Sequence, residues 1–514
     1  MEQGSQTIGG TLGGLIAASV RRWGDRPALV CGDQALTYAE LGLRCRKAVA
    51  ALADLGLARG SAIALLAPNG IDVMVATAAA MLAGIRTTPL SMLASDEDLA
   101  WLIADSEVDA VCVHASQADR LAKLASTASK RPRVLTFGAA EGHADFGQLI
   151  DAATPMPLGS SAQPSDIAVI GYTGGTTGRP KGVVHSHRSA LAAVMMATAE
   201  WEWPEAPRVL AATPVSHAAG ILAYPTWLRG GTFHLLPAFS PESFEAYVRA
   251  HRIGCTFLVP TMIYRLLDHA RDHGLDLGPM ETILYGAAPM AVDRLVEALN
   301  RFGPIFMQLY GQTEAPTCIS YLARAQHQAA RPDRLGSVGV PLAALDLALL
   351  DDEGRPAGDG EPGEICVRGA FVMEGYWKRP DETAEALRGG WLHTGDVGRF
   401  DADGYLHLVD RKKDLIISGG FNIYPREVED VIGAIAGVRA CAVVGVPDPL
   451  WGEAVTAAIV ADPDAPDDAA IIAEVKARRG NAAAPKRIVR LAELPQTAIG
   501  KIDKKILRSS VATQ

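Results

Sequence analysis

Residues 171–188, GYTGGTTGRPKGVVHSHR, gather the side chains of this sequence that are best suited to binding phosphate. The glycines let backbone N–H groups approach an anion, and the threonines and Lys181 add hydroxyl and ammonium donors. The apolar run at 167–170 predicts a buried strand before the loop, and the residues from Ser189 onward predict a helix after it. We therefore expect a strand–loop–helix unit in which the helix dipole assists phosphate binding.

The loop is not a Walker A motif, because Pro180 precedes Lys181 and Gly182 follows it, where that motif requires Ser or Thr. A flexible surface turn is the simplest alternative, since Gly, Thr and Pro are common in turns. Three threonines and a lysine among five glycines favour phosphate, because so many donors together suit a polyanion.

Further polar clusters follow predicted strands. They lie at 213–217, 260–262, 286–289 and 310–314, after strands predicted at 209–212, 255–259, 282–285 and 305–309. In open α/β sheets, ligands bind beyond the carboxyl ends of the strands, so we expect these clusters to form one site. Each also has an ordinary interpretation: His217 as a loop histidine, Tyr310 as a buried aromatic and Glu314 as a solvated carboxylate.

The predicted helices and strands alternate along the chain, and they must position these clusters. Helices are predicted at 38–55 and 72–83, and strands at 62–66, 87–90 and 110–113, which indicates a mostly parallel sheet with helices on both faces. Residues 330–400 are rich in glycine and in the sequence pattern of β-strands. Beyond the charged run at 410–414 lies a unit of about 100 residues, a plausible small domain.

In this order along the chain, the motifs resemble those of the adenylate-forming superfamily, which includes acyl-CoA synthetases, aryl-CoA ligases, peptide-synthetase adenylation domains and beetle luciferases. The resemblance runs from Tyr38 to Leu507. It implies an α/β fold with an N-terminal domain at 1–410, made of doubly wound sheets and a small β-barrel subdomain. A mobile α+β C-terminal domain is expected at 411–514, with Lys413 as its hinge.

The resemblance also implies an AMP-forming acid–CoA ligase, which converts a carboxylate, ATP and coenzyme A to acyl-CoA, AMP and diphosphate through an acyl-adenylate. Tyr310 would stack on adenine, Thr313 would bond the α-phosphate, and Asp396 with Arg411 would hold the ribose. The implied nucleotide-binding residues are Thr173, Gly174, Gly175, Thr176, Thr177, Lys181, Gly286, Ala287, Ala288, Gln308, Tyr310, Gly311, Thr313, Asp396, Arg411 and Lys501.

Four of the implied residues are catalytic: Thr173, His217, Glu314 and Lys501. Glu314 would ligate Mg²⁺, which prefers hard oxygen donors beside a triphosphate. Lys501 would lie between the carboxylate and the α-phosphate, and His217 beside the carboxylate pocket.

The resemblance also locates the acid and the thiol. The implied CoA tunnel residues are Ser418, Gly419 and Gly420, and the acid pocket residues are His217, Ala218, Ala219, Gly220, Tyr224, Gly286, Ala287 and Gly311. These pocket residues offer neither a cation for a second carboxylate nor an anion for an amine. Since an unpaired polar group would be penalised there, we expect an apolar monocarboxylic acid, fatty or with a bulky ring.

Composition excludes other classes of protein. A net charge of −10 argues against nucleic-acid binding, which requires a basic surface. The seven cysteines are scattered, odd in number and without a CxxC pair, as expected of a reduced cytoplasmic protein. No signal peptide or membrane-spanning run is evident, and the partner expected is a small carboxylic acid. A homodimer remains open.

Several alternatives share these motifs. The acyl acceptor could be a separate carrier protein, and a luciferase-like oxygenase or a regulator without catalysis is also conceivable. Amino-acid activation is disfavoured, because no aspartate stands near residues 216–219. The segment 480–484 lacks the Tyr and Lys of many relatives, which bears on the contacts to the nucleotide end of coenzyme A.

Overall fold

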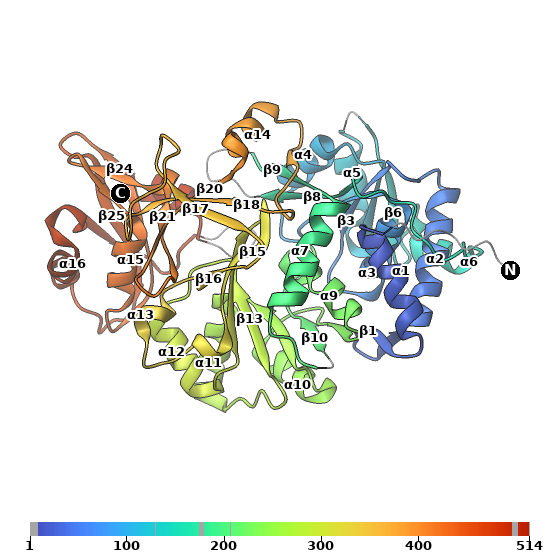
Figure 1. Ribbon diagram of the computed structural model, residues 1–514, viewed down its shortest axis with the longest axis horizontal. Coiled ribbons are helices and arrows are strands. Elements are labelled where there is room, and N and C mark those ends of the chain that lie inside the picture. Colours follow the sequence, from blue (N-terminus) through green and yellow to red (C-terminus); the bar gives the residue numbers. More distant parts are fainter. Residues whose placement is uncertain (1–8, 129, 174–178, 206, 496–501, 513–514) are drawn as a thin grey trace.

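The computed structural model describes residues 9–128, 130–173, 179–205, 207–495 and 502–512. Two large, mostly parallel sheets form the first part of the chain, and two smaller sheets follow (Figure 1). The sheet formed last in the chain lies at the opposite end of the molecule from the N-terminal helices. This is the predicted α/β architecture.

The first large sheet has eight strands. Its order is β19 (Gly375–Tyr376), β9 (Lys181–Ser186), β8 (Ile167–Thr173), β4 (Arg86–Pro89), β3 (Ala62–Leu66), β5 (Ala110–His114), β6 (Arg133–Phe137) and β7 (Ala144–Asp145). From β8 to β7 the neighbours pair in parallel, whereas β8–β9 and β9–β19 are antiparallel.

The second large sheet has nine strands. Its order is β16 (Val340–Pro341), β15 (Ala315–Leu322), β14 (Phe306–Gln312), β13 (Thr282–Gly286), β12 (Cys255–Leu258), β10 (Arg208–Ala211), β11 (Thr232–Leu235), β1 (Pro27–Cys31) and β2 (Gln34–Thr37). The inner strands from β14 to β1 are parallel.

One layer of helices lies between the two large sheets. These helices share a single apolar core with the facing sides of both sheets, and they are α1 (Leu12–Trp23), α2 (Tyr38–Asp54), α3 (Ile71–Ala83), α6 (Phe146–Ala152), α7 (His187–Glu200), α8 (Ala218–Ile221) and α9 (Ala223–Leu228). On β3, Ile63 and Leu65 face this core, whereas Ala64 and Leu66 face the other side. Burial on both faces explains why the strand is a continuous apolar run.

The outer faces carry helices as well. The eight-stranded sheet is covered by α4 (Asp96–Ser106) and α5 (Ala118–Ala125). The nine-stranded sheet is covered by α10 (Pro241–His251), α11 (Pro260–His273), α12 (Val292–Phe302) and α13 (Pro332–Leu335). No helix in the described part of the chain is both long and apolar enough to cross a membrane.

The β-rich region at 330–400 forms an antiparallel sheet. Its order is β17 (Asp346–Leu350), β18 (Gly363–Arg368), β20 (Leu392–Phe400) and β21 (Leu406–Arg411), and α14 (Pro380–Ala386) precedes β20. The chain leaves β21 through a short 3₁₀ turn, Lys412–Asp414. The predicted domain boundary at 410/411 falls at the end of β21 and stays a prediction.

A five-stranded sheet follows this turn. It consists of β22 (Ile416–Ser418), β23 (Phe421–Ile423), β24 (Val438–Asp448), β25 (Gly452–Ala461) and β26 (Arg487–Arg490). One face packs on α15 (Pro425–Gly433) and α16 (Asp468–Ala483), and the other packs on α17 (Lys504–Ala512).

Two local predictions are wrong. The phosphate loop does not lead directly into a helix: it joins β8 to β9 in an antiparallel hairpin, and α7 begins only after β9, at His187. The helix dipole is therefore separated from the loop by the length of a strand. In addition, β14 continues through Gln312 and turns back as β15, so Tyr310 lies within a strand rather than beyond its end.

Candidate active site

The β8–β9 hairpin of one large sheet and a turn of the other meet at the centre of the site. Thr313 and Glu314 form the turn between β14 and β15, where Gln312 pairs with Ala315. His185 on β9 reaches this turn, with its Nε2 atom 2.7 Å from the carbonyl oxygen of Thr313. On β8, a Cβ added to Gly171 would lie 3.2 Å from Thr313 Cγ2. The phosphate hairpin and the Thr313–Glu314 turn are therefore in direct contact.

Glu314 lies in this turn with 7% of its surface exposed. The Tyr376 hydroxyl donates to its Oε1 atom at 2.8 Å, and the Met373 N–H donates to its backbone oxygen at 2.9 Å. Burial, and then the charge of Glu314, raise the pKa of Tyr376, so the phenol remains a proton donor. Pairing of β19 with β9 holds Tyr376 in place. A buried carboxylate in one fixed orientation suits a Mg²⁺ ion that also binds phosphate.

Lys181 follows the phosphate loop, at the start of β9. Its ammonium group forms an ion pair with Glu382 on α14 and lies 5.0 Å from the centre of the Tyr376 ring. Thr173, the last residue of β8, pairs with Lys181 across the hairpin. Tyr376 thus lies beside both Lys181 and Glu314, the two charged residues predicted to act on the polyphosphate.

The predicted ribose site is assembled from three strands. Asp396 on β20 is 8% exposed, and it pairs in register with Arg411 on β21. The Tyr310 hydroxyl donates to Asp396 Oδ2 at 2.7 Å, and Arg411 Nε donates to Oδ1 at 3.1 Å. The charge of Asp396 raises the pKa of Arg411. Tyr310 and Arg411, both predicted to bind the nucleoside, thus each form a hydrogen bond with Asp396.

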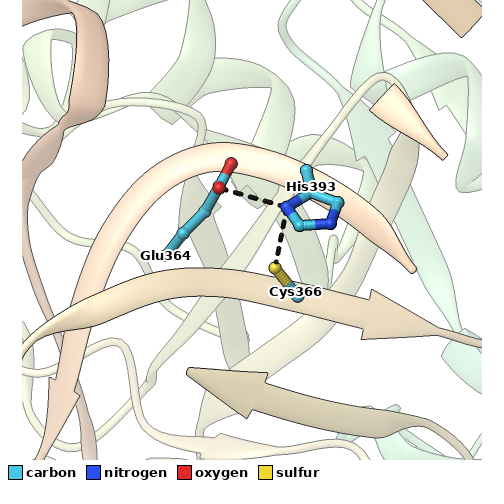
Figure 2. A group of neighbouring side chains, drawn as sticks. All are labelled: Glu364, Cys366 and His393. Carbon is cyan, nitrogen blue, oxygen red and sulfur yellow. Dashed lines mark hydrogen bonds and ion pairs between the residues drawn. The ribbon is translucent and has the colours of Figure 1, made fainter. Parts of the chain in front are cut away.

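Another buried polar group lies beside Asp396. Figure 2 shows Glu364, Cys366 and His393, whose ligand-type atoms lie within 4.8 Å of one another. His393 Nδ1 is 3.1 Å from Glu364 Oε2 and 3.3 Å from Cys366 Sγ. Such a set resembles the ligands of a zinc ion. Glu364 Oε2 also faces Arg388 Nη2 at 3.1 Å and Lys412 Nζ at 3.4 Å, and two side-chain cations at one oxygen disfavour a metal ion.

The predicted acid pocket surrounds the start of α8. His217 is exposed, Ala218 is half-buried and Ala219 is fully buried. Tyr224 packs edge-to-face on Trp227, with ring centres 6.1 Å apart. These residues are close in sequence, and the structure places them on one helical segment.

Two pocket glycines have a different explanation. A Cβ on Gly220 would lie 2.1 Å from the Val215 carbonyl oxygen, and a Cβ on Gly286 would lie 2.2 Å from the Leu309 oxygen. Close backbone packing therefore requires glycine at both positions. The inference that many small residues leave room for a bulky ring is correspondingly weakened, and it now depends on Ala218, Ala219 and Ala287.

The remaining adenine-side residues lie along β13 and β14. Gly286 ends β13, Ala287 follows it with φ +65°, and Ala288 is half-buried. Gln308 on β14 is buried near the hydroxyl of Tyr285, and Gly311 is half-buried. Gly174, Gly175, Thr176, Thr177 and Lys501 lie outside the described residues, as does the side chain of Lys413.

The predicted CoA-tunnel turn faces solvent. Ser418 is buried, but Gly419 and Gly420 are exposed. The flanking Ile417 and Phe421 are 55% and 62% exposed. The glycines have φ angles of +58° and +81°, a region where other residues are strained. In this arrangement the turn is not packed against the large sheets.

Sequence reasoning missed Asn69, His185, Glu364 and Tyr376. Asn69 follows β3, and its Nδ2 group donates to the backbone oxygens of Ala211, Thr213 and Leu236 at 3.0–3.1 Å. Its Oδ1 accepts the Val215 N–H at 2.8 Å. Asn69 thus fixes the loop that leads to His217. Asn69 follows a buried strand, so the expectation that ligands bind beyond the carboxyl ends of strands could have identified it.

Comparison with known proteins gives consistent matches. The family model for AMP-binding enzymes matches residues 16–377, and that for the AMP-binding enzyme C-terminal domain matches 427–501. The medium/long-chain-fatty-acid–CoA ligase of Mycobacterium tuberculosis is 41% identical, over 97% of this chain and 89% of that protein. The feruloyl-CoA synthase of an Amycolatopsis species is 39% identical, over 92% and 93%.

Solved structures agree. The amide bond synthetase of Marinactinospora thermotolerans superimposes with a TM-score of 0.89 at 35% identity, covering 97% of this chain and 99% of that one. The ATP-bound MatB protein of Rhodopseudomonas palustris gives a TM-score of 0.88 at 28% identity, covering 98% and 99%.

Proposed function

Because the chain belongs to the AMP-binding enzyme family, we propose that it activates an apolar monocarboxylic acid as an acyl-adenylate and transfers the acyl group to coenzyme A. The enzyme is an AMP-forming acid–CoA ligase, and it uses ATP with coenzyme A as co-substrate. The observation that carries the assignment of the site is the contact between the phosphate hairpin and the Thr313–Glu314 turn.

The adenylation step must bring a carboxylate onto the α-phosphate of ATP, although both are anions. Lys181 begins β9 of the phosphate hairpin and Thr313 lies in the turn that this hairpin contacts, so both are proposed to donate to phosphate oxygens. Lys501 is proposed to offset charge at the reacting carboxylate. Preorganised donors of this kind act strongly where water is excluded. A Mg²⁺ ion held by Glu314 would supply Lewis-acid stabilisation of the polyphosphate charge.

The nucleoside is proposed to lie between β13 and β20. Tyr310 offers its ring to adenine while its hydroxyl holds Asp396. A carboxylate accepts hydrogen bonds at both oxygens, and each oxygen has more than one lone pair. Asp396 can therefore accept the ribose hydroxyls without releasing Tyr310 or Arg411.

The acid is proposed to be apolar, because Ala218, Ala219 and the Tyr224 ring supply its surroundings. The names of the two relatives above describe fatty and phenylpropenoid monocarboxylic acids, which fits this proposal. The bulky-ring preference has less support, since Gly220 and Gly286 are required by the backbone.

Three candidate functions differ in the acceptor of the acyl group. Coenzyme A is favoured by the relatives that are named CoA ligases. An amine is the second candidate, because the amide bond synthetase matches over nearly the whole chain. A carrier-protein thiol is a third possibility on the same chemistry.

The test uses both half-reactions. Pyrophosphate exchange into ATP should depend on an added carboxylate, with decanoate and ferulate active and sulfoacetate inactive. AMP should then be released when coenzyme A is added. AMP release with an amine but not with coenzyme A would replace the thioester assignment, and exchange without any carboxylate dependence would refute adenylation.

A further inference from the structure

Strand β20 bulges immediately before Asp396. Its pairing with β18 passes from His393, opposite Cys366, to Val397, opposite Glu364, so that residues 394–396 lie opposite Ile365 alone. Gly395 has a φ of +71°, which glycine adopts without steric cost. Bulges commonly redirect a side chain beside a functional site. Here the bulge determines where the predicted ribose carboxylate points.

The bulge is held by hydrogen bonds that replace the regular ladder. Thr394 Oγ1 donates to the Ile365 oxygen at 2.7 Å and accepts the Asp396 N–H at 3.1 Å. The Gly395 N–H, which points away from the ladder, donates to Glu364 Oε1 at 3.1 Å. Glu364 thus supplies an acceptor directly beside Asp396.

The other oxygen of Glu364 contacts the residue that follows Arg411, the second residue of the predicted ribose site. Lys412 Nζ lies 3.4 Å from Glu364 Oε2, and the same ammonium group pairs with Asp352. Lys412 directly follows Arg411, just as Gly395 directly precedes Asp396. The single carboxylate of Glu364 therefore contacts the chain neighbours of both Asp396 and Arg411.

Electrostatics favour an ionised Glu364. The residue is 6% exposed, and burial alone would raise its pKa. The hydrogen bond from His393 and the charge of Lys412 outweigh burial and lower the pKa of Glu364. Burial raises the pKa of the Cys366 thiol to about 12, which favours its neutral form beside Glu364. The group drawn in Figure 2 is thus arranged around one anion.

We propose that Glu364 is a positioning residue for the nucleotide: its carboxylate holds the β20 bulge and Lys412, so that Asp396 and Arg411 face the ribose together. The proposal rests on the proposed function, in which Asp396 accepts the ribose hydroxyls. Glu364 does not touch the nucleotide and acts only through its neighbours.

The experiment compares ATP with 2′,3′-dideoxyATP in pyrophosphate exchange. Glu364→Gln keeps the size of the side chain but removes the charge that gathers Lys412 and His393. Loss of a partner that orients a metal ligand typically weakens metal binding about 10- to 100-fold, and we expect the KM for ATP to rise by a similar factor here. The KM for dideoxyATP, which lacks the hydroxyls, should change little. The KM for the acid should stay close to wild type.

Asp401→Asn is the matched control. Asp401 lies at the far end of the β20–β21 hairpin, where it accepts His407 Nε2 at 2.8 Å and the Tyr405 N–H at 2.9 Å. This variant should lose stability without changing the preference for ATP. Lys412→Met serves if Glu364→Gln fails to fold, because Lys412 is 43% exposed and only one contact of Glu364 is lost. Like Glu364→Gln, Lys412→Met should reduce the preference for ATP over dideoxyATP.

The outcomes separate the two proposals. A wild-type enzyme that exchanges pyrophosphate without a carboxylate refutes the proposed adenylation. A wild-type enzyme that does not distinguish ATP from dideoxyATP removes the proposed ribose site. The role of Glu364 is overturned if the wild type prefers ATP to dideoxyATP and the variants at Glu364 and Lys412 show the same preference. Binding of one equivalent of Zn²⁺ that Cys366→Ser abolishes would also overturn it, because the carboxylate would then serve a metal.

Discussion

Removing the Tyr376 hydroxyl should weaken the binding of the Mg²⁺ ion that Glu314 is proposed to hold. The hydroxyl donates to Glu314 Oε1 at 2.8 Å, and Glu314 is 7% exposed. Tyr376→Phe keeps the ring beside Lys181 and deletes only that hydrogen bond. Because Oε1 accepts this hydrogen bond, Oε2 can bind a cation while the bond holds the carboxylate in one orientation. Without this hydrogen bond, the bound metal ion itself would have to order the Glu314 carboxylate.

The magnitude follows from the type of bond. A hydrogen bond to a charged group contributes about 1.5–3 kcal/mol, and burial of Glu314 leaves little screening by water. Since about 1.4 kcal/mol is a factor of ten, the loss corresponds to roughly 10- to 150-fold in metal affinity. Partners that orient a metal ligand typically contribute 10- to 100-fold, which is the same range.

The assay is pyrophosphate exchange at saturating ATP and acid, with free Mg²⁺ varied. The concentration for half-maximal exchange should rise roughly 10- to 100-fold in Tyr376→Phe, while the rate at saturating Mg²⁺ stays near wild type. Tyr405→Phe is a suitable control, because this buried tyrosine loses only a hydrogen bond from Gln326 Nε2 at 3.1 Å. An unchanged Mg²⁺ dependence with a collapsed saturating rate would refute the reasoning.

Three further outcomes are expected. Lys501→Ala should lower adenylation by roughly two to three powers of ten while sparing thioester formation from a supplied acyl-adenylate; equal loss in both steps would contradict its role. Lys413→Pro should preserve pyrophosphate exchange and abolish thioester formation, with an unchanged circular dichroism spectrum, because proline fixes φ at the hinge; wild-type thioester rates would place the hinge elsewhere. Burial lowers the pKa of His187 to about 4, so the unfolded chain, with a value near 6.5, is protonated first. Stability should therefore fall as pH drops from about 6.5 toward 4, with a shallower decline in thermal melting for His187→Gln.

The alternation of strands and helices could be predicted because it depends on local periodicity. Strand β3 is an unbroken apolar run since both of its faces are buried. Helix α2 begins at Tyr38, and the preceding Thr37 caps it together with Glu40. The functional clusters could be located for a related reason. Parallel strands end at a common edge, so polar residues after buried strands predict a site there.

The path of the phosphate loop could not be predicted in the same way. Residues 181–186 include Lys181, His185 and Ser186, and this mixture does not alternate as a half-exposed strand would. The segment becomes β9 because it pairs with β8 on one side and with β19, almost 200 residues later, on the other. Such long-range pairing leaves no local periodicity. The same reason conceals β15, which depends on β14 and β16.

By itself, the sequence determined the residue types at the strand ends, and hence the kind of chemistry that they can perform. Only the tertiary structure decided which of them share a hydrogen bond. Tyr376 meets Glu314, His185 meets Thr313, and Glu364 joins the neighbours of Asp396 and Arg411, in each case across 31 or more residues of chain. These contacts form because folding buries carboxylates and carbonyls that then require donors, and the donors come from whichever element packs beside them.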